Sequence, residues 1–169
     1  MTITIRKALK GDMPVVYELM KGLAEYMQVG SPPAIHLDDL YRDGGFDGGH
    51  AYFFVLLAED SDHKNPDGSL APVGYTMYSY IYCLGGKSMF MRNMFVKPSH
   101  RLKGVGKLIF GELVKYAKET GCHRMEFLVP EWNPAKEFYK KMGAVNYTLR
   151  TGYEYYRLNE DAIHHFGQE

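Results

Sequence analysis

One short glycine-containing segment carries the residues best suited to chemistry. It reads Arg101-Leu102-Lys103-Gly104-Val105-Gly106-Lys107 and lies between a predicted strand and a predicted helix. Glycines at a helix start let backbone N–H groups approach an anion without obstruction by a Cβ atom. The amides of the first turn and the positive end of the helix dipole also favour negative charge. The segment therefore predicts a pyrophosphate site, with a plain helix cap as the alternative.

The charge pattern around this segment supports a small anionic ligand. The chain of 169 residues has 20 Lys and Arg against 20 Asp and Glu, so its formal charge is zero. Residues 68–111 nevertheless contain no Asp or Glu, while six Lys or Arg fall within them. A local cationic zone in a neutral chain suits a small polyanion better than DNA. We therefore expect neither nucleic acid nor a membrane as a partner.

Composition and cysteine usage narrow the class of protein. The hydrophobic fraction of 46% and the aromatic fraction of 14% are typical of a folded domain. The longest apolar run, residues 51–58, is too short to span a membrane, and the N-terminus lacks a signal-peptide pattern. Cys83 and Cys122 lie far apart, so we expect reduced thiols, a cytoplasmic protein and no metal. His100 and His123 each lie near basic residues, and we expect both at the surface.

Hydrophobic periodicity and turn residues predict the elements of the first half of the chain. A helix is expected to begin at Met13-Pro14 and to run to Tyr26, before Ser31-Pro32-Pro33 breaks it. A turn-rich loop is expected at residues 60–69 and a hairpin turn at Gly85-Gly86. The other expected elements are a short helix over 37–41 and strands at 3–5, 51–58, 73–83 and 89–97.

The second half of the chain alternates helix and strand signals. An apolar stripe with helical spacing begins at Val105, and Gly121 closes that helix. Asn133-Pro134 opens a further helix that Gly143 ends. The two strands predicted here are residues 125–129 and residues 146–158, the latter hinged at Gly152.

Three motifs together resemble a known family. The pattern Arg101-x-x-Gly104-x-Gly106 after a strand looks like the pyrophosphate motif of the GNAT N-acetyltransferases, which hold acetyl-CoA. Residues 127–133 and 138–144 are similar to the diamine (spermidine/spermine) and thialysine acetyltransferase branch. The resemblance implies a single α+β domain over residues 1–169. It also implies a mixed, mostly antiparallel, twisted sheet that a bulge splays and that helices flank.

The resemblance assigns the residues that bind the cofactor. It implies that the backbone amides of Met94, Phe95 and Val96 hold the pantetheine arm and polarise the thioester carbonyl, and a fixed donor there would stabilise the oxyanion. It assigns the pyrophosphate to the segment from Arg101 to Lys107. Asn133 matches a cofactor contact, although its place before a proline would also explain it as a helix cap.

The resemblance also assigns the proton transfers. Tyr139 matches the general acid that protonates the departing CoA thiolate, and a phenol with a pKa near 10 stays protonated at neutral pH. An amphipathic-helix tyrosine is the alternative. For the base, Glu126 matches a substrate contact of the family and Glu131 lies just beyond it, and either could relay a proton through water.

The acceptor side departs from the diamine branch. That branch has Glu-Asp where this sequence has Arg92-Asn93, and its other acidic positions fall here at Met27 and Thr151. Losing carboxylates and gaining a cation disfavours spermidine or spermine. Arg92 could instead bind the carboxylate of an amino-acid-like acceptor, or it could simply face solvent. Tyr26 is a further candidate on the acceptor side.

With this resemblance, the sequence predicts an acetyl-CoA-dependent N-acetyltransferase that acts on a small primary amine, either amino-acid-like or a diamine, by direct attack in a ternary complex. Two alternatives stay open, namely a non-catalytic acyl-CoA-binding module and an acetyltransferase of a protein or peptide amine. The resemblance also implies a homodimer with the late strands near its interface. The aromatic residues compatible with such an interface are Tyr147, Tyr153, Tyr155 and Tyr156.

Overall fold

The computed structural model describes residues 2–28, 34–65 and 68–167, and it divides into two compact units. The first unit is Met1–Leu128 and the second is Val129–Glu169, and each is described by itself. The expected chain break at Ser31-Pro32-Pro33 lies outside the described residues. No helix among the described residues is long and apolar enough to cross a membrane.

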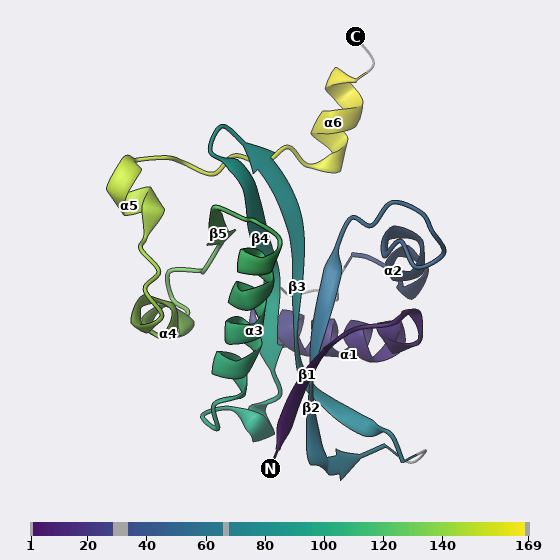
Figure 1. Ribbon diagram of the computed structural model, residues 1–169. Coiled ribbons are helices and arrows are strands. Elements are labelled where there is room, and N and C mark those ends of the chain that lie inside the picture. Colours follow the sequence, from purple (N-terminus) through teal and green to yellow (C-terminus); the bar gives the residue numbers. More distant parts are fainter. Residues whose placement is uncertain (1, 29–33, 66–67, 168–169) are drawn as a thin grey trace. The chain divides into compact units, whose positions relative to one another are not determined.

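The first unit is built on a five-stranded mixed sheet (Figure 1). The strands follow one another in chain order across the sheet. The first three pairings are antiparallel, and β4 with β5 is parallel. The strands are β1 (Ile3–Lys7), β2 (Phe54–Lys64), β3 (Leu70–Cys83), β4 (Gly86–Val96) and β5 (Arg124–Phe127).

Helices cover both faces of this sheet, because side chains alternate between the faces along each strand. Helices α1 (Met13–Tyr26) and α2 (Leu37–Asp43) pack on one face. Helix α3 (Val105–Glu119) packs on the opposite face, where Figure 1 shows it in front of β4 and running roughly along that strand. Two short 3-10 turns, η1 (Lys10–Asp12) and η2 (Pro98–His100), lead into α1 and towards α3.

The two cores show how the alternation works. On the α1 face, buried residues of the helices pack on buried residues of β2, β3 and β4, with Val55, Leu57 and Phe95 among them. On the α3 face, Val105 and Ile109 of the helix pack on Ala58 and Val73. The predicted α+β fold with a helix-flanked sheet is confirmed.

A bulge in β4 separates the sheet into two parts. Met77 of β3 pairs with Asn93, whereas the next residue pairs with Met91, so Arg92 is the extra residue. The pairing with β5 ends at the same point, with Met91 opposite Phe127. Among the described residues, β4 therefore continues from Asn93 to Val96 with a partner on its β3 side only. The splayed sheet that the family resemblance implied is present.

The second unit contains three short helices. Helix α4 (Ala135–Lys141) follows Asn133-Pro134 as predicted. The strand predicted over 146–158 is wrong, because α5 (Tyr147–Thr151) occupies its first part and residues 152–159 form no regular element. The Asn146 side chain accepts a hydrogen bond from the Leu149 amide, and this local cap replaces the distant partner that a strand needs. The last helix is α6 (Glu160–Phe166).

The second strand is longer than the sequence predicts. It begins at Phe54 rather than at residue 51 and runs to Lys64, into the expected loop of residues 60–69. Asp60 pairs with Ile3 on one side and with Ala71 on the other, so tertiary pairing overrides the local turn signal.

A substitution at Gly74 tests the close packing of β3 against β4 and α3. A Cβ atom there would lie 2.8 Å from the Phe95 carbonyl oxygen and 3.1 Å from Ile109 Cδ1. We expect Gly74→Ala to lower the free energy of unfolding by ~1–3 kcal/mol, because a packed core must shift to admit the methyl group. Urea denaturation measures this.

Gly111 provides the matched control. Its Cβ would meet nothing within 4 Å on an exposed helical surface. Gly111→Ala should raise stability by ~0.4–1 kcal/mol, since only the unfolded chain loses freedom. Equal stability of the Gly74→Ala variant and the wild type would show that the strand does not pack as described.

Candidate active site

The glycine segment connects η2 to the first turn of α3. Gly104 is the N-cap residue and has φ +84°, a left-handed conformation that favours glycine. A Cβ atom on Gly104 or on Gly106 would have nothing within 4 Å, so the backbone there is open to a ligand. No side chain hydrogen bond caps this helix start among the described residues. Amides at such a helix start can bind an anion, and the pyrophosphate site at this position stays a prediction.

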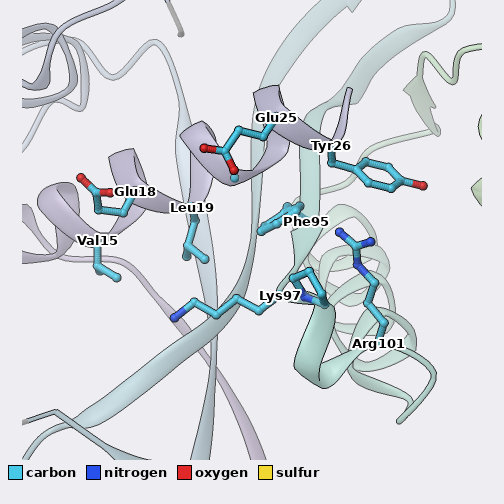
Figure 2. Close-up of a pocket in the computed structure, with 10 residues that line it drawn as sticks. Val15, Glu18, Leu19, Glu25, Tyr26, Phe95, Lys97 and Arg101 are labelled. Carbon is cyan, nitrogen blue, oxygen red and sulfur yellow. The ribbon is translucent and has the colours of Figure 1, made fainter. Parts of the chain in front are cut away.

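The cations of this segment fall into two groups. Lys103 and Lys107 are exposed beside the helix start. Arg101 instead turns towards α1, where its guanidinium lies 4.4 Å from the centre of the Tyr26 ring and 5.4 Å from that of Phe95 (Figure 2). Its Nε donates to the Val96 carbonyl at 2.9 Å. Arg101 thus joins the end of β4 to the end of α1.

A cavity of about 360 Å³ lies between α1 and the end of β4 (Figure 2). Its lining contains acidic and basic side chains. The acidic ones, Glu18 and Glu25, come from α1, and the basic ones, Lys97 and Arg101, follow β4. The remaining lining is mainly apolar or aromatic, and consists of Val15, Leu19, Gly22, Tyr26, Phe95 and Pro98. Such a cavity offers partners to both an ammonium and a carboxylate.

The sequence reading missed three of these charged residues, namely Glu18, Glu25 and Lys97. The two glutamates are seven positions apart, and this spacing of two helical turns places them on one face of α1. That spacing was the sequence signal from which a shared position on α1 could have been predicted. The meeting of α1 with the end of β4 has no local signature in the sequence.

The three β4 residues predicted to bind the cofactor divide between the two faces. Phe95 is buried on the α1 face and lines the cavity. Met94 and Val96 pack on the α3 face. All three lie in the part of β4 beyond the bulge, where pairing with β5 has ended.

Comparison with known proteins identifies the family. A family model described as "Acetyltransferase (GNAT) family" matches residues 16–144, which is more than half of the chain. The chain belongs to the GNAT acetyltransferase family. The predicted family is thereby confirmed, and the match includes the glycine segment and the motif of residues 138–144.

Curated relatives lie in the predicted branch of GNAT proteins. A human spermidine/spermine N(1)-acetyltransferase-like protein 1 is 32% identical over 94% of this chain, which spans only 23% of that relative's length. A thialysine N-epsilon-acetyltransferase of Sus scrofa is 29% identical over 96% of this chain and 95% of its own. An L-ornithine N5-acetyltransferase of Arabidopsis thaliana is 31% identical over 53% of this chain and 42% of its own length.

Solved structures agree with the GNAT fold. An integron cassette protein from the mobile metagenome of V. cholerae has a TM-score of 0.75 and 22% identity, covering 100% of this chain and 99% of its own. A soil metagenomic aminoglycoside acetyltransferase has a TM-score of 0.70 and 14% identity, covering 93% of this chain and 97% of its own. At these identities the similarity concerns the fold alone.

Of the predicted acceptor residues of this GNAT chain, Tyr26 is the one that lines the described cavity. Met27 follows it as the C-cap of α1. Arg92, in the bulge, is exposed and does not line the cavity. Its guanidinium lies 4.3 Å from the centre of the Phe90 ring, and its Nε is 3.4 Å from the Ser79 hydroxyl. The solvent-facing alternative therefore describes Arg92 in this structure.

Glu126 lies where β4 and β5 are still paired. Its carboxylate accepts a hydrogen bond from the Ser88 hydroxyl at 2.8 Å and from Arg124 Nε at 3.2 Å. Glu126 is not one of the residues that line the cavity. These two partners fix the carboxylate on the strand, and its role as base stays a prediction.

Tyr139 and Asn133 belong to the second unit. Tyr139 is buried on α4 with its ring centre 5.1 Å from that of Phe138, and burial raises the pKa of its hydroxyl to about 12. A hydroxyl with this pKa keeps its proton at neutral pH. Asn133 is buried and its Oδ1 accepts from the Ala135 amide, the first of α4, at 2.9 Å, while its contact with the cofactor stays a prediction. Thr151 donates to the Tyr147 carbonyl at 2.7 Å within α5, rather than lying on a strand.

The two histidines expected at the surface differ. His123 is exposed. His100 is buried, with a relative exposure of 4%, and its Nε2 lies 3.3 Å from Asp60 Oδ2. That expectation is wrong for His100 because η2 turns its side chain towards a strand forty residues earlier in the sequence.

Proposed function

We propose that this GNAT chain is an acetyl-CoA-dependent N-acetyltransferase of a small primary amine, with direct attack in a ternary complex. One observation carries the proposal. Among the described residues, the glycine-containing start of α3 has no side-chain cap, and it follows, after η2, a strand whose last residues lack a partner on one side. A helix start of this kind suits a pyrophosphate, and an open strand edge suits the amide-containing arm attached to it.

The residues from Arg101 to Lys107 fit the cofactor. The amides of Val105 and Gly106 would hold the pyrophosphate, with Lys103 and Lys107 adding charge at the surface. Arg101 orients the end of β4 through the Val96 carbonyl. Acetyl-CoA supplies the activated acetyl group as a thioester, and backbone amides in the open part of β4 would stabilise charge on its carbonyl oxygen.

We assign the acceptor amine to the cavity beside α1. Its mixed charge favours a zwitterion, with Glu18 and Glu25 for ammonium groups and Lys97 and Arg101 for a carboxylate. The names of the thialysine and ornithine acetyltransferase relatives agree with an amino-acid-like amine. Arg92 stays a second candidate for the carboxylate at the rim of the sheet.

Tyr139 is the proposed general acid. Its raised pKa keeps the hydroxyl protonated, as a donor to the leaving thiolate must be. We further propose that the whole chain acts as one domain. The family match supports this, because residues 16–144 cross the boundary between the two units. A cytoplasmic location is supported by the free cysteines Cys83 and Cys122.

We also propose that the chain forms a homodimer through residues 147–158. Apolar side chains in this segment are strongly exposed, with Leu149 at 84% and Tyr156 at 83%. Tyr147, Tyr153, Tyr155 and Leu158 are exposed as well. A run of this kind is characteristic of an interface. The interface would use α5 and the irregular segment after it, instead of the strands expected from the sequence.

Gly106 tests the cofactor site. We expect Gly106→Ala to weaken acetyl-CoA binding by at least about tenfold, because its Cβ occupies space that a phosphate would use. Isothermal titration calorimetry measures the affinity. Gly111→Ala, a glycine five residues further along α3, should bind acetyl-CoA like the wild type. If the wild type and both variants bound acetyl-CoA equally well, the proposal that the pyrophosphate binds at this helix start would be contradicted.

Tyr139→Phe tests the chemistry. We expect kcat to fall by ~10²–10⁴-fold with unchanged acetyl-CoA affinity, because only the donated proton is lost. CoA release should be assayed with lysine, ornithine, thialysine and spermidine, and the amino acids should be the better acceptors. In the wild type, loss of the Tyr139 proton should lower kcat only above pH 10, since its pKa is about 12. Tyr82→Phe, at a tyrosine 86% exposed on β3, is the control.

The outcomes of this assay are distinct. Turnover that survives in Tyr139→Phe would reject the proposed acid while keeping the enzyme. Turnover on spermidine alone would contradict the zwitterion assignment. No turnover on any amine, with acetyl-CoA still bound, would favour a non-catalytic module or a protein acceptor.

Light scattering after size-exclusion chromatography tests the dimer. We expect twice the chain mass of 19.3 kDa for the wild type. Tyr156→Lys should shift the protein to monomer, because a charge would be buried in the interface. Tyr82→Lys changes an equally exposed tyrosine of the first unit and should remain dimeric. A monomeric wild type would refute the interface.

A further inference from the structure

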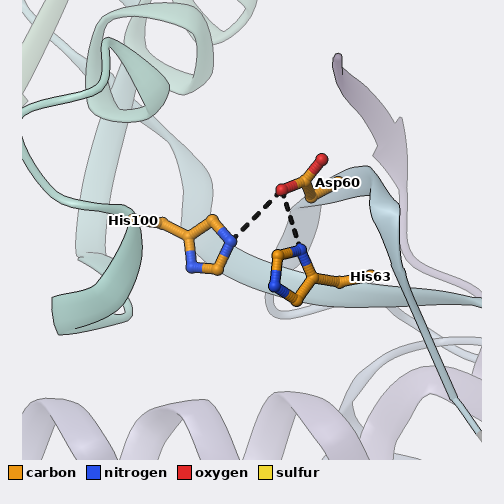
Figure 3. Close-up of side chains that lie close together, drawn as sticks. All are labelled: Asp60, His63 and His100. Carbon is orange, nitrogen blue, oxygen red and sulfur yellow. Dashed lines mark hydrogen bonds and ion pairs between the residues drawn. The ribbon is translucent and has the colours of Figure 1, made fainter. Parts of the chain in front are cut away.

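Three potential metal-ligating side chains converge on one point beside β2 (Figure 3). Asp60 Oδ2 lies 3.0 Å from His63 Nδ1 and 3.3 Å from His100 Nε2. The three ligand atoms all lie within 4.8 Å of one another. Asp60 and His63 come from β2 and His100 comes from η2, so the cluster joins two segments distant in sequence.

These separations suit a transition metal ion. Metal–ligand bonds of about 2.0–2.2 Å place the donor atoms of a tetrahedral zinc site roughly 3.3–3.5 Å apart. The two carboxylate–imidazole distances lie at or just below this range. Two imidazoles and one carboxylate are a donor set that zinc accepts, with one position left for water.

Neighbouring groups already orient the donors. The Ser99 hydroxyl lies 2.8 Å from His100 Nδ1, which leaves Nε2 facing Asp60. The second carboxylate oxygen of Asp60 accepts a hydrogen bond from the Asp62 amide at 3.1 Å. Such outer contacts fix the direction of a ligand before the metal arrives.

Because Asp60 is buried, its carboxylate charge is unfavourable unless a bound cation or a protonated histidine balances it. The side chains of Asp60 and His100 are only 1% and 5% exposed, whereas that of His63 is 57% exposed. A buried carboxylate requires either a protonated partner or a metal to balance its charge. The exposed His63 provides the side from which an ion and a water molecule can enter.

We propose that Asp60, His63 and His100 form a binding site for a divalent zinc-class metal ion. The ion would cross-link the end of β2 to η2. Because His100 directly precedes Arg101, it would also fix the point from which the glycine segment starts. The site stands apart from the acetyl transfer chemistry, so its test does not depend on the proposed function.

Zinc binding to the full, tag-free chain provides the test. Competition with a chromophoric chelator should show one tightly bound Zn²⁺ per chain, and Co²⁺ should give the visible absorption of a four-coordinate site. His63→Ala should weaken Zn²⁺ binding by at least about tenfold, since even outer-shell changes cost 10–100-fold. Zn²⁺ should raise the melting temperature of the wild type and not that of His63→Ala.

Two control variants keep the result interpretable. His123→Ala removes an exposed histidine outside the cluster and should bind like the wild type. His63 is chosen because its exposure lets the variant fold, which its melting curve without metal verifies. Absence of stoichiometric binding would overturn the proposal. So would binding that survives in His63→Ala but is lost in His164→Ala, because that places the metal on the tail.

Discussion

The rest of this structure depends on one strand that must leave its neighbour. β4 pairs with β3 on both sides of the bulge residue Arg92, but its pairing with β5 ends at Met91, just before the bulge. Backbone groups that lose a strand partner require another one. Under the proposed function, the edge from Asn93 to Val96, which β5 does not pair with, would receive a ligand that carries its own amides. The strand leads through η2 into the glycine segment, so this edge and the proposed anion site follow each other along the chain.

The same strand also serves two cores. Phe95 faces α1 and closes the floor of the charged cavity, while Met94 and Val96 anchor α3 on the opposite face. Because β4 contacts both faces, the segment that follows it can contribute to the cavity beside α1 and to the start of α3. Arg101 reaches back over Tyr26 to the cavity, and the amides that follow it open towards the start of α3. Gly74 permits the close approach that this arrangement requires.

Local signals in the sequence predicted the glycine segment, α1, α3 and α4, because prolines, glycines and helical periodicity depend only on residues close together in the chain. The predictions that failed depend on distant partners. Residues 146–158 have the composition of a strand, but the Asn146 cap provides a closer partner than any strand. His100 is buried by contact with Asp60, forty residues away, and no spacing rule joins them. The only sequence signal for the cavity glutamates, Glu18 and Glu25, was their separation by seven positions.

Hydrogen exchange of backbone amides, with and without CoA, tests the central claim most directly. We expect CoA to slow exchange at Val105, Gly106 and Lys107 and at Met94 and Val96, since these amides would donate to the ligand. The amide of Phe95 between them faces β3 and should not change. Amides within the β2–β3 pairing should not change, because their hydrogen bonds are already formed. Unchanged exchange at the start of α3 and along the open edge of β4, at CoA concentrations that saturate binding, would contradict the account.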